Sequence, residues 1–154
     1  MKRADGRSDC PTNFTVEALG DSWSLLILRD ILALGKRSFG EFLASDERIG
    51  QSVLAERLDR LERTGLVSRS TSPTDARKQL YIATERGIDV IPLLLEAVRW
   101  GVGGLPPVGE DDPWMQVLQV DRGDLIAAWQ RSVRAGRSLF GDGGALEDLA
   151  AAGA

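Results

Sequence analysis

The stretch SFGEFLASDERIGQSVLAERLDRLERTG, residues 38–65, decides the fold. Ser38 and Glu41 form an S-x-x-E pattern, which marks the first turn of a short helix. Gly50 begins a longer helix in which leucines recur every three or four residues and so share one face. Gly65 ends this helix in the left-handed conformation that favours glycine. Two helices joined by so short a turn predict a helix-turn-helix pair.

Two further helices precede this pair. Cys10-Pro11 opens the first, because proline is favoured at the first helical position and leaves Cys10 as the N-cap. Gly20 ends it, and Asp21 caps the next helix. That helix, residues 23–34, is apolar nearly all round, which predicts the central buried helix.

A β-hairpin is predicted after the pair. Residues 66–70 and 80–83 read as strands, and the polar segment between them has the composition of a turn. Thr84 then caps a long helix that runs to about Trp100. Pro92 lies inside its pattern and predicts a kink or a late start. Four helices, a hairpin and a further helix in this order describe a winged helix with an additional N-terminal helix, in which the fourth helix enters the DNA major groove.

Four segments follow from these patterns. We expect a flexible leader over 1–9, a winged helix-turn-helix domain over 10–101, a linker over 102–113 and a C-terminal helical extension over 114–154. The fold class is therefore mostly α with a small β-hairpin, flanked by an N-terminal helix and the C-terminal extension.

The extension is predicted in less detail. Residues 114–120 fit a strand or a short helix, and Asp121 opens an amphipathic helix. From Gly141 onward we expect a frayed acidic tail. The apolar stripe of the amphipathic helix is too large to leave in water, so it packs on a partner subunit or on its own winged helix. The stripe comprises Leu125, Ile126, Trp129, Val133 and Phe140.

Composition excludes several classes of protein. The 154 residues include one cysteine and no histidine, which argues against a disulfide framework, a zinc site or a histidine-based enzyme. We therefore expect no enzyme, cofactor or metal. No apolar run reaches the roughly 18 residues of a membrane span, and no signal-peptide core follows the N-terminus, so we expect a cytoplasmic protein without membrane contact. The four tryptophans fit core and interface positions.

The net charge of −4 is unusual for a nucleic-acid-binding protein. Residues 1–100 carry 15 basic and 15 acidic side chains, whereas residues 101–154 carry 4 basic and 8 acidic ones. The whole excess of negative charge therefore lies in the extension. Any basic DNA-binding patch must be local.

The sequence resembles the HxlR family of bacterial regulators over about residues 10–101. The resemblance implies a transcriptional regulator that binds a pseudo-palindromic operator in double-stranded DNA as a homodimer, through its N-terminal and C-terminal helices, with a small-molecule effector as an additional partner. The wing segment Asp75-Ala76-Arg77, followed by Thr84-x-x-Gly87, also resembles the MarR family. The residues that carry the HxlR resemblance are Cys10-Pro11, 19–29, 39–42, Val53-Leu54, Arg57-Leu58, Leu61-Glu62, 65–67, Arg69, Pro73, Tyr81, Thr84 and Gly87.

Ten residues are candidates for DNA contact. Gln51 and Ser52, at the start of the fourth helix, are the best candidates for base contacts, with Arg48 beside them. We expect the hairpin residues to contact phosphates, which position the protein without specifying sequence; ordinary surface charge is the alternative. The remaining candidates are Ala55, Glu56, Arg57 and Arg63 on the fourth helix and Arg69, Arg77 and Lys78 on the hairpin.

The fourth helix departs from the resembled family. Where the family usually has a Ser or Thr cap, then Lys or Arg, Thr and Arg, this chain has Gly50, Ser52, Ala55 and Asp59. Acidic side chains on this face would be repelled by phosphate. Ordinary i,i+4 pairs, Glu56–Arg60 and Asp59–Arg63, are the alternative explanation for them.

Cys10 has two interpretations. A thiol at a helix N-terminus has a lowered pKa, which favours the reactive thiolate. Members of the resembled family often sense oxidants or electrophiles through a cysteine at this place, and a single cysteine could form an adduct or an intersubunit disulfide. The alternative is an inert cap residue. A winged helix that has lost DNA affinity and binds a protein or ligand remains the alternative function.

Overall fold

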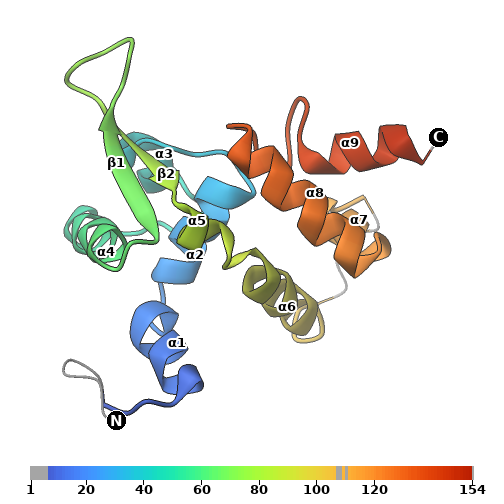
Figure 1. Cartoon of the computed structure of the whole chain (residues 1–154), viewed down its shortest axis with the longest axis horizontal. Coiled ribbons are helices and arrows are strands. Elements are labelled where there is room, and N and C mark those ends of the chain that lie inside the picture. The colour runs from blue at the N-terminus through green and yellow to red at the C-terminus, as the bar shows by residue number, and fades with distance from the viewer. Residues whose placement is uncertain (1–6, 107–108, 110, 154) are drawn as a thin grey trace.

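The computed structural model describes residues 7–106, 109 and 111–153. Most of the predicted leader and three residues of the predicted linker therefore lie outside the described residues. The elements, drawn in Figure 1, are α1 (Pro11–Leu19), α2 (Ser24–Leu32), α3 (Phe39–Leu43), α4 (Gln51–Arg63), β1 (Val67–Thr71), β2 (Gln79–Ala83), α5 (Glu85–Ile88), α6 (Ile91–Val102), α7 (Pro113–Gln119), α8 (Arg122–Arg134) and α9 (Ala145–Ala152).

Helix α2 lies at the centre of the molecule, as predicted. Its Leu28 and Leu32 are fully buried, and it contacts α1, α4, α6 and β2. The Asp21 carboxylate accepts hydrogen bonds from the backbone amides of Trp23 and Ser24, at 2.8 and 2.9 Å. It thereby satisfies amides at the helix start although Trp23 is the N-cap. The helix ends at Leu32, two residues earlier than predicted.

The helix-turn-helix pair follows the prediction closely. The backbone amide of Ser38 donates to Glu41 Oε2 over 2.7 Å, and the reciprocal bond completes a capping box at the start of α3. Helix α4 buries three leucines completely, as the spacing predicted: Leu54, Leu58 and Leu61. Gly65 ends the helix with a φ of +72°.

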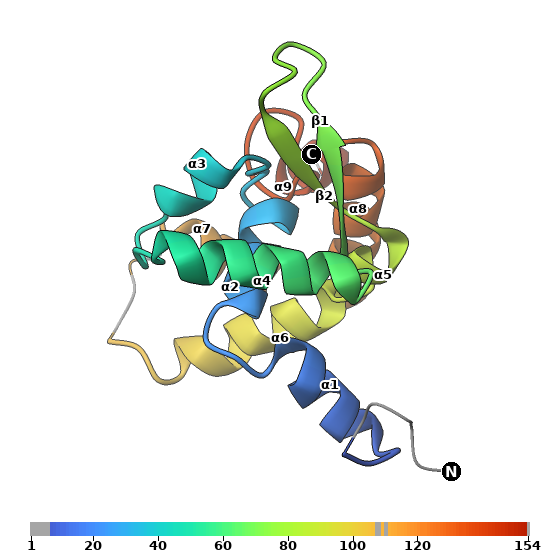
Figure 2. The same ribbon diagram turned by 90° about the vertical axis from the view of Figure 1, so that its left-hand side faces the viewer.

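The hairpin pairs β1 with β2 in antiparallel register, from Val67 opposite Ala83 to Thr71 opposite Gln79. A bridge between Ser38 and Leu80 attaches its far strand to the start of α3. Figure 2 shows α4 lying across the front of the molecule with the hairpin rising above it. This is the winged-helix arrangement that the sequence predicts.

The helix predicted after Thr84 is divided in two. Thr84 Oγ1 accepts from the amide of Gly87 over 3.1 Å and caps the short α5. Helix α6 then begins at Ile91, with Pro92 in its first turn, where the missing amide hydrogen breaks no helical bond. The late start is thus confirmed. Gly87 is required here, because a Cβ atom would lie 2.1 Å from the carbonyl oxygen of Leu66.

The C-terminal extension packs against its own winged helix. Residues 113–119 form a helix rather than a strand, and the stripe on α8 buries Leu125 and Trp129 completely. Helix α8 ends at Arg134, before Gly136 with its φ of +78°, so Phe140 is not part of its stripe. Phe140 instead lies in the following loop, where its ring contacts Trp114 edge to face at 4.8 Å.

The frayed tail that we expected is wrong for most of its length. Residues 145–152 form α9, which packs along α8, and Leu139 and Ala145 are fully buried. The backbone amides of Leu139 and Phe140 donate to the carbonyls of Leu32 and Ala33, at 3.2 and 3.0 Å. These bonds attach the extension to the end of α2. None of the described helices is long and apolar enough to cross a membrane.

Candidate nucleic-acid interface

The exposed face of α4 is the candidate surface for base contacts. Gln51, Ser52 and Ala55 are exposed along its first half, on the side opposite the buried leucines. Gly50 precedes them without a side chain, and a Cβ atom there would meet nothing within 4 Å. The start of the helix is therefore open to a partner. In Figure 2 helix α4 lies at the front of the molecule.

Arg48 and Arg63 lie at opposite ends of this helix. Arg48 is exposed in the turn before α4 and has a φ of +56°, a left-handed conformation that is unusual for a non-glycine residue. Arg63 is the last residue of α4. At about 1.5 Å per residue, α4 is roughly 18 Å long from Gln51 to Arg63. Arg48 thus joins Gln51 and Ser52 in one group, and Arg63 does not.

The acidic residues on α4 are paired, but not as the i,i+4 pattern predicts. Arg69, on β1, places its Nη2 atom 2.6 Å from both Asp59 Oδ1 and Glu62 Oε2. The same guanidinium lies 5.5 Å from the centre of the Tyr81 ring. The predicted pair Asp59–Arg63 is replaced by this interaction, which joins α4 to the hairpin. Arg69 is therefore occupied within the protein.

Arg57 has a second structural role. It donates to Asp21 over 3.1 Å and to Glu56 over 2.7 Å, and its side chain is mostly buried. The predicted pair Glu56–Arg60 is thus replaced by a pair between neighbours. Arg60 instead donates to the carbonyl of Glu17. These contacts join α4 to α1 and to the start of α2.

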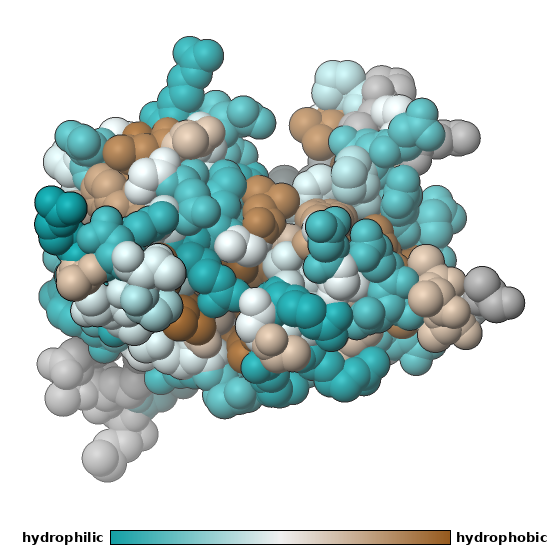
Figure 3. All heavy atoms as spheres, turned by 90° about the horizontal axis from the view of Figure 1, so that it is seen from above, coloured by the Kyte–Doolittle hydropathy of each residue, from teal (hydrophilic) through white to brown (hydrophobic). Residues whose placement is uncertain are grey.

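The hairpin tip carries two exposed cations of the candidate set. The side chain of Arg77 is 95% exposed, with Asp75 Oδ1 at 3.7 Å from its Nε, and Lys78 is exposed beside it. Backbone bonds between Ser72 and Lys78 and between Lys78 and Asp75, at 2.8 and 2.9 Å, shape the tip. Seen from above Figure 1, this end of the molecule is mainly hydrophilic, with apolar residues in small separate patches (Figure 3).

A buried ion cluster, which sequence reasoning missed, holds the turn between α3 and α4. Asp30, 3% exposed, accepts from Arg29, Lys36 and Ser45 at 2.6, 3.0 and 2.5 Å. Arg29 also binds Glu47 through two bonds of 2.5 and 3.0 Å, and this pairing lowers the pKa of Glu47 to about 2. The cluster fastens the turn to α2. Its signal in the sequence was the adjacent charges Arg29-Asp30 in an apolar helix.

Cys10 is exposed at the N-terminus of α1, where it was expected. The backbone amides of Asn13 and Thr12 lower the pKa of its thiol below the ordinary value, because they stabilise the thiolate. Its own carbonyl accepts from the amide of Phe14 over 3.0 Å, which fixes the first turn. Thiolate formation is therefore favoured at this position.

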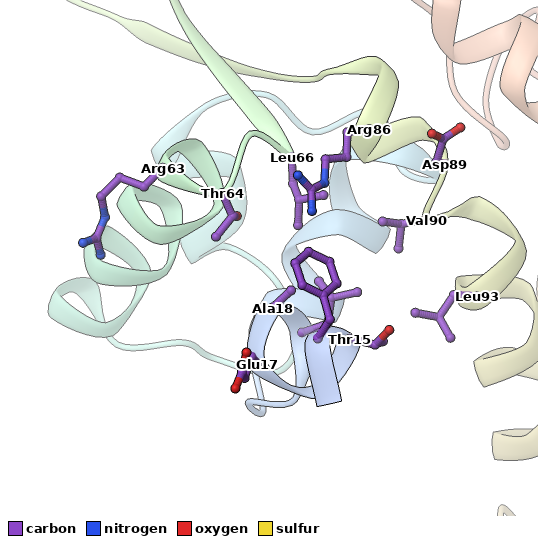
Figure 4. Close-up of a pocket in the computed structure, with 12 residues that line it drawn as sticks. Thr15, Glu17, Ala18, Arg63, Thr64, Leu66, Arg86, Asp89, Val90 and Leu93 are labelled. Atoms are coloured by element: carbon purple, nitrogen blue, oxygen red, sulfur yellow. The ribbon is translucent and has the colours of Figure 1, made fainter. Parts of the chain in front are cut away.

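A groove of about 610 Å³ with mixed polar and apolar walls lies between α1 and the segments around Leu66 and Val90. Figure 4 shows Ala18 on one side and Val90 and Leu93 on the other. Every residue of α1 is exposed or half-buried, and Figures 1 and 2 both show this helix projecting from the body. Arg86 lies over the ring of Phe14 at 5.0 Å and bridges the groove.

Comparison with known proteins places this geometry in a family. A model of the HxlR-like helix-turn-helix family matches residues 18–107. The chain is 31% identical over 98 residues to YdeP of Bacillus subtilis strain 168, an uncharacterized HTH-type transcriptional regulator, across 64% of this chain and 76% of YdeP. It is 32% identical over 96 residues to the HTH-type transcriptional regulator YodB of the same strain, across 62% and 85%.

A solved structure shares the fold. The redox regulator HypR in its oxidized form superposes with a TM-score of 0.56 at 29% identity, over 64% of this chain and 100% of HypR. The matched region contains the helix-turn-helix pair, the hairpin and α6, whereas α7 to α9 lie beyond the family model. The resemblance to the HxlR family is thus confirmed, over residues 18–107. The chain belongs to the HxlR-like helix-turn-helix family and is a transcriptional regulator of the winged-helix type.

Proposed function

We propose that this regulator binds a pseudo-palindromic operator as a homodimer, with α4 in the major groove and the hairpin tip on the flanking backbone. Gln51 and Ser52 contact base edges, because they are exposed at the start of α4 and can both donate and accept hydrogen bonds. Arg48 contacts a phosphate beside them. Half-sites are then spaced by about one helical turn or a multiple of it, as two-fold symmetry demands.

The observation that carries this proposal is the pairing of the α4 acids with Arg69 and Arg57. Unpaired carboxylates on a recognition helix would repel phosphate and oppose DNA binding. Asp59 and Glu62 share the Arg69 guanidinium at 2.6 Å, and Glu56 binds Arg57 at 2.7 Å. The negative charge of the helix is therefore balanced locally, which supports its approach to DNA.

The wing residues Arg77 and Lys78 supply phosphate contacts. Both are exposed at a tip that extends beyond α4, so they can reach the backbone beside the occupied groove. Arg63, at the far end of α4, contacts phosphate on the opposite side. By contrast, Arg57 and Arg69 support the interface indirectly, because their guanidinium groups already bind carboxylates of α4.

We infer that the dimer forms through the N-terminal helix and α6. The stripe on α8 is buried within its own subunit, which leaves it unable to cover a partner. Val16 on α1 is 50% exposed, and Trp100 on α6 is 86% exposed. Exposed apolar side chains of this size mark interaction surfaces. Trp100→Ala should lower the dimer fraction in sedimentation experiments, whereas Gln130→Ala on α8 should not. Equal dimer fractions would contradict this interface.

Cys10 makes the regulator responsive to oxidants or electrophiles. Its lowered thiol pKa and full exposure support this role, and the redox regulator HypR is a structural relative. With one cysteine per chain, an adduct or an intersubunit disulfide is the product. Diamide should release the wild-type protein from DNA and leave Cys10→Ser bound. Release of Cys10→Ser at the same diamide concentration would assign Cys10 to an inert cap.

A mobility-shift titration tests the DNA-binding proposal. The probe is the promoter region of the regulator's own gene, at two salt concentrations. Binding should weaken steeply as salt rises, because phosphate contacts release counterions. Arg77→Ala with Lys78→Ala should weaken binding to all sequences and lower the salt slope by about two. Arg122→Ala with Arg131→Ala removes the same charge from α8 and serves as the control.

Two results would overturn the proposal. Unchanged affinity of the Arg77→Ala, Lys78→Ala variant would remove the hairpin from the interface. No binding by the wild-type protein at low salt would favour a winged helix that recognises a protein or ligand instead of DNA.

A further inference from the structure

We propose that a second cavity, lined mainly by α2, α6 and α7, binds a neutral and largely apolar small molecule that alters DNA affinity through Arg29. The effect on DNA rests on the proposed function, whereas the binding of the ligand does not. We call this site the α7 cavity. Its main apolar wall residues are Leu25 and Leu26 of α2, Ala97 and Val98 of α6, and Trp114 and Met115 of α7.

The shape of the α7 cavity suits a small ligand. Its volume is about 370 Å³, within the range of roughly 300 to 1,000 Å³ that is usual for small-molecule sites. The six wall residues are half-buried and come from three helices, so the surface is concave and already formed. The indole of Trp114 offers a flat face for an aromatic or alicyclic ring, and Met115 adapts to irregular shapes.

The charged groups that line the cavity are largely paired within the protein, and this limits the polar groups that a ligand can carry. Only Arg29 and Asp112 among the described wall residues carry a charge. The guanidinium of Arg29 is held by Asp30 and Glu47, so an anionic ligand would compete with two carboxylates. Asp112 Oδ1 accepts from the amide of Trp114 over 2.8 Å, which leaves its other oxygen for one donor. A neutral ring compound with at most one hydroxyl or aromatic N–H donor fits these walls.

Arg29 connects the α7 cavity to the turn that precedes α4. Its side chain forms part of the wall, while its guanidinium bonds Glu47 in the turn between α3 and α4. That turn leads directly into Gln51 at the start of α4. A ligand that displaces the Arg29 side chain weakens the Glu47 bonds and releases the turn. The Arg29–Glu47 bonds thus couple the α7 cavity to the start of α4.

The third wall lies outside the part of the chain that the family model matches. Trp114 and Met115 lie beyond residues 18–107, the part that the family model matches. The walls from α2 and α6 come from the shared domain, and α7 closes them. The ligand preference of this regulator is therefore set by its C-terminal extension.

A neutral fluorophore tests the cavity directly on the full chain. N-phenyl-1-naphthylamine, which brightens in apolar surroundings, should bind with one saturating site per chain. Ala97→Phe places a ring in the α7 cavity and should weaken binding about tenfold or more. Ala150→Phe, at an exposed position of α9, makes the same substitution outside the cavity and should bind as the wild type does. Equal affinity in Ala97→Phe and wild type would overturn the site.

The groove beside α1 is the competing location. Ala18→Phe fills that groove instead, because Ala18 is among its lining residues. Loss of fluorophore binding in Ala18→Phe, with retention in Ala97→Phe, would assign the ligand to the α1 groove and refute the α7 cavity. Circular dichroism confirms that each variant is folded before its affinity is compared.

The coupling between the α7 cavity and the Arg29–Glu47 contact can be tested by fluorophore affinity alone, without DNA. Glu47 contributes to the ion cluster but not to the cavity wall, and Glu47→Gln removes the charge that holds Arg29. By reciprocity, this substitution should change fluorophore affinity about fivefold or more. Unchanged fluorophore affinity in Glu47→Gln would contradict the proposed coupling between the cavity and the turn.

DNA binding then separates this inference from the proposed function. Saturating fluorophore should change operator affinity of the wild type about fivefold or more and leave Ala97→Phe unaffected. If the wild type binds the fluorophore and the operator independently, the regulatory role of the cavity is wrong while the operator proposal stands. If the wild type binds the fluorophore but no DNA, the proposed function fails and the ligand site stands.

Discussion

The indole Nε1–H of Trp129 donates to the backbone carbonyl of Leu32 over 2.8 Å, across 97 residues of sequence. Trp129 is fully buried, and the same carbonyl also accepts from the amide of Leu139. Helix α8 and the loop after it therefore supply the hydrogen-bond donors for the C-terminal end of α2. The extension and the winged helix share one core.

Trp129→Ala should destabilise the whole protein by about 3–5 kcal/mol, because it leaves a large cavity behind α2. Trp129→Phe keeps most of the volume and should cost about 1–2 kcal/mol, since Leu32 retains the bond from Leu139. Urea unfolding at neutral pH measures both changes. Arg131→Ala, exposed on the same helix, is the control and should stay within about 0.5 kcal/mol. A Trp129→Ala protein as stable as this control would separate the extension from the core.

Arg69→Ala should weaken operator binding about tenfold by exposing two carboxylates on α4 to phosphate. The double variant Arg69→Ala, Asp59→Asn should recover part of this loss, because one of the unpaired charges is removed. Mobility shifts at low salt measure these proteins and Asp59→Asn alone. If Arg69 instead contacted phosphate itself, its removal would cost the same affinity in the Asp59→Asn background as in the wild type. The comparison therefore separates the supporting role of Arg69 from a direct one.

Glu47→Gln should lower the free energy of unfolding at neutral pH by about 1 kcal/mol or less, because Glu47 is partly exposed. Arg29 lowers the pKa of Glu47 from about 4.5 to about 2 in the folded protein. The carboxylate thus contributes its stability above pH 4.5, and this contribution is lost as the pH falls toward 2.

Urea unfolding of wild type and Glu47→Gln along a pH series measures the effect. The two curves should converge on the acid side of this window. Glu96→Gln, which breaks an exposed pair with Arg122, is the matched control and should change little at any pH. A wild-type advantage that persists unchanged in acid would contradict the role of Arg29 in holding Glu47 charged.

Alkylation of Cys10 by iodoacetamide should reach its half-maximal rate at a lower pH in the native protein than in urea. The amides of Asn13 and Thr12 stabilise the thiolate only while α1 is folded. Mass spectrometry of samples quenched along a pH series gives both profiles from one thiol. Coincident profiles would mean that the helix start leaves the thiol unchanged.

Features set by neighbouring residues could be predicted from the sequence. The capping box of Ser38 and Glu41, the helix end at Gly65 and the late helix start at Pro92 each depend on a few adjacent positions. The exposed face of α4 followed from helical periodicity for the same reason. Most of the winged helix was accessible in this way.

Features that depend on distant partners could not be predicted. Asp59 has a basic residue four positions later, yet it pairs with Arg69 because the hairpin folds back over α4. Helix α9 was missed because Gly141, Gly143 and Gly144 suggest a frayed end. Gly141 and Gly143 in fact adopt positive φ values in the turn that brings α9 back onto α8. The ion cluster around Asp30 likewise forms only once α2 meets the turn.

The bonds from Leu139 and Phe140 to the end of α2 also bear on domain exchange between regulators. A chimaera joined in the segment between α6 and α7 would place a foreign tail behind α2 and leave the carbonyls of Leu32 and Ala33 without these donors. Such carbonyls are costly when buried and unpaired. Recombination at this glycine- and proline-rich junction would therefore yield poorly folded hybrids. In such hybrids α2 and the C-terminal extension should therefore come from the same parent protein.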